Sequence, residues 1–576
     1  MSNRKTICCL ILCFSYWHLL QAQNIKDSAK KNPFTISGGI GASANFYTSN
    51  EPLYSQPSYS WNVYGNFTPK INKILLPFSF VINQYGNSNR SPYIQMGISP
   101  TYKWAKLHLG YHYIRFSPLI YDGQSFRGVG IELNPKLFRF AAFYGKLNKA
   151  VNEDTTSGRF RLPQYSRTGY GVKIGIGNLS RYVDLVYFHA KDDSSSASFV
   201  KDTTKNYIRA QENAVLGTSF KLTMVKKLIL TGDFAISGLI QDQSFDKRGL
   251  DSSNPGLRKF IRNFLHNNAS TLANYAGQSS LSFYNRNFNS NLGYRRVQPN
   301  FKSLGTPYMI NDIELISWLN NFSMVKGKIN VSTSLSHQHN NLDNTLPVEM
   351  RTQVGNFNIN TILGQHFNLN FNYSGYNLKQ KNNDTLLVKD ESLLNQLISQ
   401  FSFNPTYNIT KDNKLHYISG NFSLQTLKDK NPTTSPYTNS NNLSSSLNYT
   451  LAFVNKPISF SLNYLYSRYK QEANSYTSNG VTLGTSAQLL KNKSLNVQGN
   501  IGYYFNRFRN SLSSTQKNIS YSVNASYYIK HHSFNLFANY VYTPPNNAIT
   551  NAINSTFPYA VATKNLAGGI SYNYSF

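Results

Sequence analysis

Six ionisable residues in the first third of the chain have types and spacing that could do chemistry together. They are His108, His112, Glu132, Arg139, Lys173 and Asp184. On the strand register described below, all six point to the interior from strands that neighbour one another. Such a charged surface could bind a charged solute or set ion selectivity. The alternative is that these groups pair with one another and with Arg286, Arg295 and Arg296, because buried charges are usually retained as pairs.

Other patterns for catalysis or metal binding are weak. His337 and His339 have the spacing that places two imidazoles on one face of a strand, but no third histidine lies near them. His531 and His532 fall in an expected tight turn. The chain has no Gly-x-Ser-x-Gly, no His-Glu-x-x-His and no phosphate-binding loop. We therefore predict no enzyme activity, no metal and no cofactor.

The elements that position these side chains are predicted to be strands. In segment 367–373 one face carries Phe367, Leu369, Phe371 and Tyr373, and the other carries Asn368, Asn370 and Asn372. The same alternation recurs in segments 458–464, 495–506 and 519–529. Period two, with one apolar face and one small polar face, is typical of strands that meet lipid on one side and water on the other.

The composition agrees with such a wall. Charged residues make up 14% of the chain, against about 25% in ordinary soluble domains. No stretch after the N-terminus reaches the roughly eighteen apolar residues of a membrane-spanning helix. The formal net charge is +32, but the lysines are scattered, with many at expected turns, and no nucleic-acid motif accompanies them. We predict turn charges beside anionic lipid head groups, and no nucleic-acid binding.

The N-terminus has the pattern of a secretory signal. Arg4 and Lys5 precede an apolar run over residues 7–20, and Ala22 provides the expected cleavage position. We assign residues 1–22 to the signal peptide and 23–576 to a single β-barrel. All three cysteines lie within the signal, so the mature protein is predicted to contain no disulfide and no cysteine metal site.

The strand count comes from turns and loops that alternate in length, with short turns expected at the periplasmic end. Eleven strands lead to about residue 241, and the tight turn at 325–327 must again be periplasmic. Parity allows only an even number of strands between residues 241 and 305, and we take the number to be none. The prediction is an all-β, antiparallel up-and-down barrel of about 24 strands with an insertion at 243–305.

The insertion contains an expected amphipathic helix. Asn254 and Pro255 give a helix start. The apolar face is then formed by Leu257, Phe260, Ile261, Phe264 and Leu265. This helix could constrict the lumen, cap the extracellular mouth or rest on lipopolysaccharide, and we favour the lumen or the mouth.

The last strand places Ile570, Tyr572, Tyr574 and Phe576 on one face. An aromatic strand that ends on a C-terminal phenylalanine resembles the closing strand by which outer-membrane β-barrels are recognised for assembly. The resemblance implies an assembly signal and a partner in the barrel-assembly machinery. The Asn/Tyr/Ser-rich strands over the whole mature chain are similar in style to large outer-membrane barrels of the Bacteroidota. This implies the outer membrane of a Gram-negative bacterium, with lipid and lipopolysaccharide as surroundings.

Two functions follow for a barrel too wide to be filled by side chains. About twelve residues separate the cleavage position from the first strand, so we expect no N-terminal plug of the kind that TonB-dependent receptors carry. The first function is transport of polar solutes or an exported polymer through an Asn/Ser-lined, partly obstructed lumen. The alternative is a non-conducting scaffold or accessory subunit of a secretion or surface-assembly complex, with partners the sequence does not name.

Overall fold

The computed structural model describes most of the chain. The described ranges are 34–50, 58–84, 95–153, 163–198, 208–245, 261–265, 268–383, 393–472, 474–490, 492–509, 514–544 and 562–576, with the single residues 256, 259, 389 and 391. The predicted signal peptide lies outside these residues.

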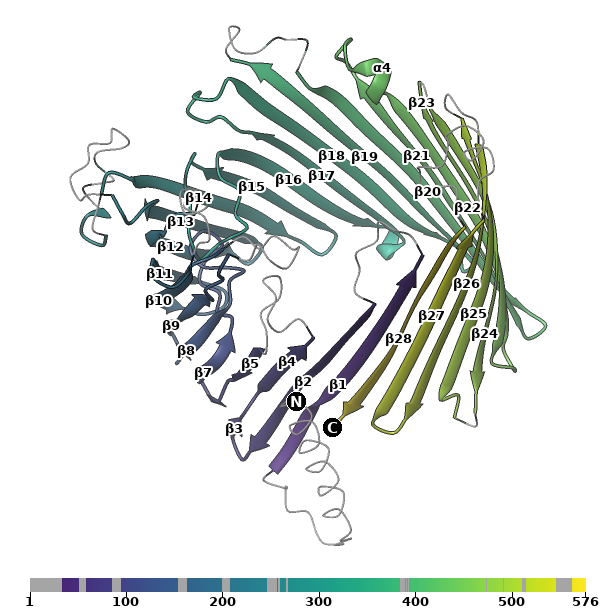
Figure 1. The fold of residues 1–576 in the computed structure, drawn as a ribbon, viewed down its shortest axis with the longest axis horizontal. Coiled ribbons are helices and arrows are strands. Elements are labelled where there is room, and N and C mark those ends of the chain that lie inside the picture. The colour runs from purple at the N-terminus through teal and green to yellow at the C-terminus, as the bar shows by residue number, and fades with distance from the viewer. Residues whose placement is uncertain are drawn as a thin grey trace, which may run out of the picture.

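The chain folds into one closed antiparallel sheet (Figure 1). Its strands are β1 (Phe34–Ser49), β2 (Tyr59–Ile71), β3 (Ile74–Leu75), β4 (Phe78–Asn83), β5 (Gln95–Ile98), β6 (Thr101–Tyr102), β7 (Ala105–His112), β8 (Phe126–Leu133), β9 (Phe138–Asn148), β10 (Ser166–Gly177), β11 (Tyr182–Asp193), β12 (Glu212–Val225), β13 (Leu228–Ile240), β14 (Thr271–Tyr284), β15 (Phe288–Val297), β16 (Ile313–Met324), β17 (Ile329–His339), β18 (Val348–Leu363), β19 (Phe367–Asn382), β20 (Asn395–Lys411), β21 (Lys414–Asp429), β22 (Ser440–Phe453), β23 (Ile458–Gln471), β24 (Ser475–Leu489), β25 (Leu495–Arg509), β26 (Ser514–Ile529), β27 (His532–Thr543) and β28 (Thr563–Ser575). The connections between described strands include a 3-10 turn at Val325–Gly327 and the short helix α4 at Ser435–Thr438.

Closure comes from the pairing of the first strand with the last. β1 pairs with β28 along eleven positions, with Ala42 opposite Tyr572, and β28 also pairs with β27. β3 and β4 both pair with β2, and β5 and β6 both pair with β7, so each of these two pairs of segments makes one interrupted wall strand. The wall therefore contains 26 strands, two more than predicted. Among the described residues, closure gives each wall strand a hydrogen-bonded neighbour on both sides.

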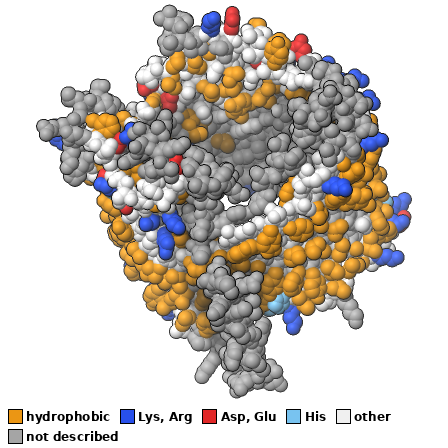
Figure 2. Space-filling model, in the orientation of Figure 1, with side chains coloured by type: hydrophobic (Ala, Val, Ile, Leu, Met, Phe, Trp, Pro, Cys, Tyr) orange, Lys and Arg blue, Asp and Glu red, His pale blue; other side chains and the backbone are white. Residues whose placement is uncertain are grey.

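The outer face of the wall is apolar. Leu185, Ile316, Leu483 and Ile501 each expose about half of their surface to the outside. Figure 2 shows such side chains as a band over the outer flank of β1 and its neighbours β27 and β28. A band of this kind is what a barrel in a lipid bilayer presents, and the predicted alternation is confirmed. No helix in the described ranges is long and apolar enough to cross a membrane.

The prediction for residues 243–305 was wrong in its main point. Residues 271–284 and 288–297 form β14 and β15, which pair with each other and with β13 and β16 as ordinary wall strands. Parity allowed an even number of strands here, and that number is two. The prediction missed them because Gly and Ser dilute their apolar outward face, as at Gly277 and Ser279 of β14.

The expected helix packs on the outside of the barrel, against the favoured alternative of lumen or mouth. Gly256, Lys259 and Ile261 are helical, whereas Leu257 and Phe260 lie outside the described residues. Ile261 and Leu265 are buried in a small cluster with residues of β12, β13 and β14. These residues lie on the lipid-facing side of the strands. Gly238, which contacts Ile261, is four residues after the exposed Phe234 of β13, so the two point to the same side of the sheet. The ring of Phe264 lies 5.9 Å from that of outward-facing Tyr187.

Candidate functional site in the barrel lumen

Two loops at the long-loop end of the barrel fold inward and pack against the wall. The first loop joins β7 to β8 over residues 113–125, and the second joins β15 to β16 over residues 298–312. Phe116, Ile120 and Tyr121 of the first loop are buried in one cluster with Phe301 of the second. The cluster also includes inward-facing residues of β8 to β16, such as Phe188. One side of the lumen is therefore filled by an apolar wedge.

The two loops are tied to each other by hydrogen bonds. The hydroxyl of Ser303 donates to the carbonyl oxygen of Ile120 at 2.6 Å. The backbone N–H of Asp122 donates to the carbonyl oxygen of Gly305 at 3.0 Å. Because these bonds join backbone groups that would otherwise be buried without partners, they fix the loops as one unit.

The wall holds this unit through polar side chains, among them Asn213, Asp233 and Ser237, whose hydroxyl donates to the carbonyl oxygen of Lys302 at 2.6 Å. Asn213 of β12 accepts from the backbone N–H of Leu304 at 3.0 Å, and its amide donates to the carbonyl oxygen of Lys302 at 3.3 Å. Asp233 of β13 accepts from the hydroxyl of Ser117 at 2.8 Å. Asn213 is fully buried. The anchoring of the wedge thus relies on hydrogen bonds that the low dielectric of the site strengthens.

These loops and their anchors were not predicted from the sequence. Apolar side chains in a loop expected to face water were the available signal, because Ile114, Phe116, Leu119 and Ile120 follow one another closely after β7. Asn213 and Asp233 resemble any other polar residue of a strand, so no local pattern identifies them.

The six predicted charged residues all face the interior, where five of them form two groups and Lys173 stands apart. In the first, Arg139 of β9 makes two hydrogen bonds to Asp184 of β11, at 2.7 and 2.9 Å. Gly175 of β10 lies between them, and a Cβ there would come within 2.0 Å of the Asp184 carboxylate. The pairing alternative therefore holds for Arg139 and Asp184.

The second group is a histidine cluster on β7 and β8. His108 is buried and lies between two partners, with its Nε2 2.8 Å from Glu132 and its Nδ1 2.9 Å from the hydroxyl of Ser99. The ring of His112 lies 4.9 Å from that of His108. Lys106 approaches Glu132 at 3.5 Å. These groups satisfy one another, so little of their charge is left for a solute.

Lys173 is the exception among the six. It faces the interior from β10 without a salt bridge to any described carboxylate, and its Nζ lies 5.6 Å from the centre of the Phe116 ring. This contact places the ammonium group of a wall residue on an aromatic ring of the first inward loop. A cation over a ring face is attracted by the ring quadrupole, so Lys173 contributes to holding the wedge.

The strands after β16 line the rest of the lumen with small polar side chains. Asn404 of β20 lies between Asn370 and Asn421 of its neighbours, with amide contacts of 3.4 and 2.5 Å. On β25, Asn500 donates to Ser522 at 3.0 Å. In the described ranges no residue after Ile313 belongs to the apolar cluster of the wedge. The filling of the lumen is therefore one-sided.

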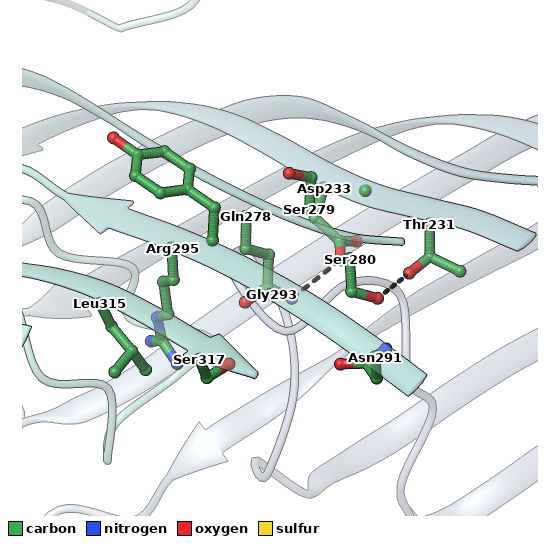
Figure 3. A pocket seen from close by; sticks show the side chains of 12 residues that line it. Thr231, Asp233, Gln278, Ser279, Ser280, Asn291, Gly293, Arg295, Leu315 and Ser317 are labelled. Atoms are coloured by element: carbon green, nitrogen blue, oxygen red, sulfur yellow. Dashed lines mark hydrogen bonds between the residues drawn. The ribbon is translucent and has the colours of Figure 1, made fainter. Parts of the chain in front are cut away.

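A hollow lies in the inner wall beside the wedge, between β13 and β16 (Figure 3). Its volume is about 250 Å³. Its polar lining includes Thr231, Asp233, Gln278, Ser280, Asn291, Arg295 and Ser317. Gln278 donates to Asp233 at 2.9 Å, and Thr231 and Ser280 share a hydrogen bond of 2.8 Å. Arg295 extends into the hollow between Leu315 and Ser317. The prediction that Arg295 pairs with the six charged residues was wrong.

The weaker patterns lie elsewhere. His337 and His339 are on the outer face, and His339 Nδ1 is 3.8 Å from a carboxylate oxygen of Glu349. No group of three His, Cys, Asp or Glu side chains is placed to hold a metal in the part of the chain that the structure describes.

The closing strand β28 presents its aromatic face outward, as its residues predicted. Ile570 lies beside exposed Leu536 of β27. The Nδ1 of His532 lies 2.8 Å from the hydroxyl of Tyr572, and the backbone N–H of Phe576 donates to the carbonyl oxygen of Gly38 at 2.9 Å. The C-terminal residue therefore lies against β1, where the barrel closes.

Comparison with known proteins gives a likeness of fold. The chain matches no known protein-family profile and no curated protein in sequence. Among solved structures, the translocation pore of the P pilus usher PapC is 10% identical, covering 94% of this chain and 99% of its own, with a TM-score of 0.36. Pseudomonas aeruginosa OpdQ is 11% identical, covering 60% of this chain and 93% of its own, with a TM-score of 0.33. Because both scores lie below 0.5, these likenesses do not bear on the function of this chain.

Proposed function

We propose that the chain is an outer-membrane channel for small polar solutes. The observation that carries the proposal is the one-sided filling of the lumen. The apolar wedge packs on the strands up to β16, whereas the later strands present Asn and Ser side chains to the remaining space. A neutral polar lining offers a passing solute exchangeable hydrogen bonds but no site that binds it tightly. In addition, wall side chains alone do not close a barrel of this width.

The outer-membrane location rests on the closed barrel and its lipid-facing apolar band, since closed barrels are the sheet structures that span membranes. Lipid and lipopolysaccharide then surround the wall, and the barrel-assembly machinery inserts it. Lys259 and Arg262 are exposed beside Ile261, which packs on the outer face of the wall. These cations suit the phosphate groups of lipopolysaccharide.

Conductance of the purified full chain in planar bilayers tests the channel. We expect stepwise conductance in KCl, and a higher unitary value when residues 114–121 are replaced by a short Gly/Ser linker that removes the wedge. The matched control replaces exposed residues 343–345 of the loop between β17 and β18.

The alternative, a non-conducting scaffold of a secretion or surface-assembly complex, is supported by the firm anchoring of the two loops to the wall. Absence of conductance from folded protein, with conductance gained on removal of the wedge, would favour the scaffold.

A further inference from the structure

We infer that the hollow between β13 and β16 is a binding subsite for a small hydroxylated solute that carries one carboxylate or phosphate group. The inference rests on the proposed channel, because the hollow opens to its lumen. It adds a substrate class that neither the strand pattern nor the neutral lining of the later strands suggests.

The first support is the state of Arg295. Three arginines of the described strands face the interior, namely Arg139, Arg167 and Arg295. Arg139 and Arg167 each make two hydrogen bonds to one carboxylate, that of Asp184 and Asp192 respectively. Arg295 forms no ion pair with a described carboxylate, and its Nε is buried without a hydrogen-bond partner there. A guanidinium with an unused donor fork is complementary to a planar or tetrahedral oxyanion.

The second support is that the one acid of the hollow is already satisfied from elsewhere. Asp233 accepts from Ser117 of the inward loop and from the amide of Gln278. Gln278 stands between Asp233 and Arg295 in the strand register and directs its donor to Asp233. The positive charge of Arg295 is thus not cancelled within the hollow, although both groups line it.

The third support is the distribution of polar groups around the space. Hydroxyls of Thr231, Ser280 and Ser317 and the amide of Asn291 line the same hollow. Gly293 opens it, because a Cβ at that position would come within 2.7 Å of the Ser317 hydroxyl. An oxyanion held at Arg295 would place the hydroxyls of the same solute among these groups. The volume of about 250 Å³ suits a solute of monosaccharide size.

The position of the hollow gives the site a role in passage. Ser117 belongs to the wedge that narrows the lumen, and its hydrogen bond to Asp233 joins the wedge to the wall of the hollow. A solute that binds there occupies the inner wall beside the constriction. Selectivity for the anionic solute then arises beside the wedge.

Binding to the detergent-solubilised full chain tests the inference by titration calorimetry, a readout independent of conductance. The probes are D-gluconate, D-glucose 6-phosphate and uncharged D-glucose. We expect at least one of the two anions to bind more tightly than glucose, and R295Q to weaken that binding about tenfold or more, as loss of a charge-assisted hydrogen bond does. R295K keeps the charge but loses the fork, so its binding should be intermediate.

The matched control is R296Q. Arg296 is the next residue of β15, faces outward and pairs with Glu314, so the same change of charge occurs outside the lumen. We expect R296Q to bind the anion as the unaltered chain does. Equal binding of the anions and glucose, no binding of either anion, or equal loss in R295Q and R296Q would overturn the subsite. Anion binding by a barrel that does not conduct would instead overturn the channel and leave the subsite.

Discussion

Arg139 and Asp184 form a two-bond ion pair that crosses a whole strand of the wall, over the space that Gly175 leaves free. Asp184 is 2% exposed and Arg139 faces the same interior surface. The pair therefore belongs to the packing of the wall and not to the lining of the pathway. This relationship separates the charges that hold the barrel from those that can meet a solute.

Breaking this pair should weaken the barrel more than it alters ion selectivity. R139Q leaves the Asp184 carboxylate buried and unpaired, which costs about 3 kcal/mol or more of unfolding free energy. The double variant R139Q/D184N removes both charges and should recover much of that loss. Urea unfolding followed by electrophoretic mobility measures both. K173Q is the control, because Lys173 has no described salt bridge; a loss in K173Q equal to that in R139Q would contradict the role of the pair.

The glycine beneath the pair should be sensitive to the smallest side chain. In G175A the new Cβ would lie 2.0 Å from Asp184 Oδ1 and 2.6 Å from the carbonyl oxygen of Val183, so the pair must shift. We expect a loss of about 1–3 kcal/mol. G499A is matched to it, since nothing lies within 4 Å of a Cβ at that position of β25. Equal unfolding free energies of the two variants would show that the Arg139–Asp184 pair can shift without loss of stability.

Deletions across 246–297 should separate the outer helix from the wall. Asp242 and Ser270 are hydrogen-bonded at the ends of β13 and β14, so a short linker can replace residues 246–267. We expect that variant to fold and to conduct as the full chain does, because the helix packs on the outer face. Deletion of 271–297 removes β14 and β15 and should abolish insertion into the outer membrane. A folded, inserted product of the second deletion would be incompatible with the observed register.

Loosening the wedge should raise conductance without unfolding the barrel. In N213A the backbone N–H of Leu304 loses its acceptor and the Lys302 carbonyl loses one donor. The loop of residues 298–312 should then move, and single-channel records should show a larger or noisier current. N370A, on the opposite lining, is the control. Identical records for N213A and the unaltered chain would mean that the wedge does not limit the current.

Loss of the last residues should prevent closure. Removing residues 572–576 deletes four of the eleven paired positions between β28 and β1, together with the contact between Phe576 and Gly38. An open edge in lipid leaves backbone groups unsatisfied. We expect the truncated chain to be degraded in the periplasm, measured by fractionation and immunoblotting. Outer-membrane amounts equal to those of the full chain would argue against the last strand as an assembly signal.

The sequence by itself determined the class of fold, the direction of most side chains and the closing strand. Alternation at period two is a local property, so Phe371 and Asn372 could be assigned to lipid and water without knowledge of their neighbours. The same rule placed Arg139, Lys173 and Asp184 inside. It failed for β14 and β15, where serines and glycines weaken the apolar face and parity allowed both none and two.

Only the tertiary structure decided which charged side chains are held in ion pairs and where the irregular segments lie. Arg139 and Arg295 are both inward arginines with a carboxylate two strands away in the register. Arg139 reaches Asp184 across a glycine, whereas Gln278 stands between Arg295 and Asp233 and donates to that carboxylate. That difference depends on register between strands, which period two does not encode. The amphipathic pattern around Ile261 fits packing on either the inner or the outer face of the wall. The structure shows that it covers Gly238 and Ala273 on the outer face. Loops turn inward when long-range partners bury their apolar groups, and those partners are distant in sequence.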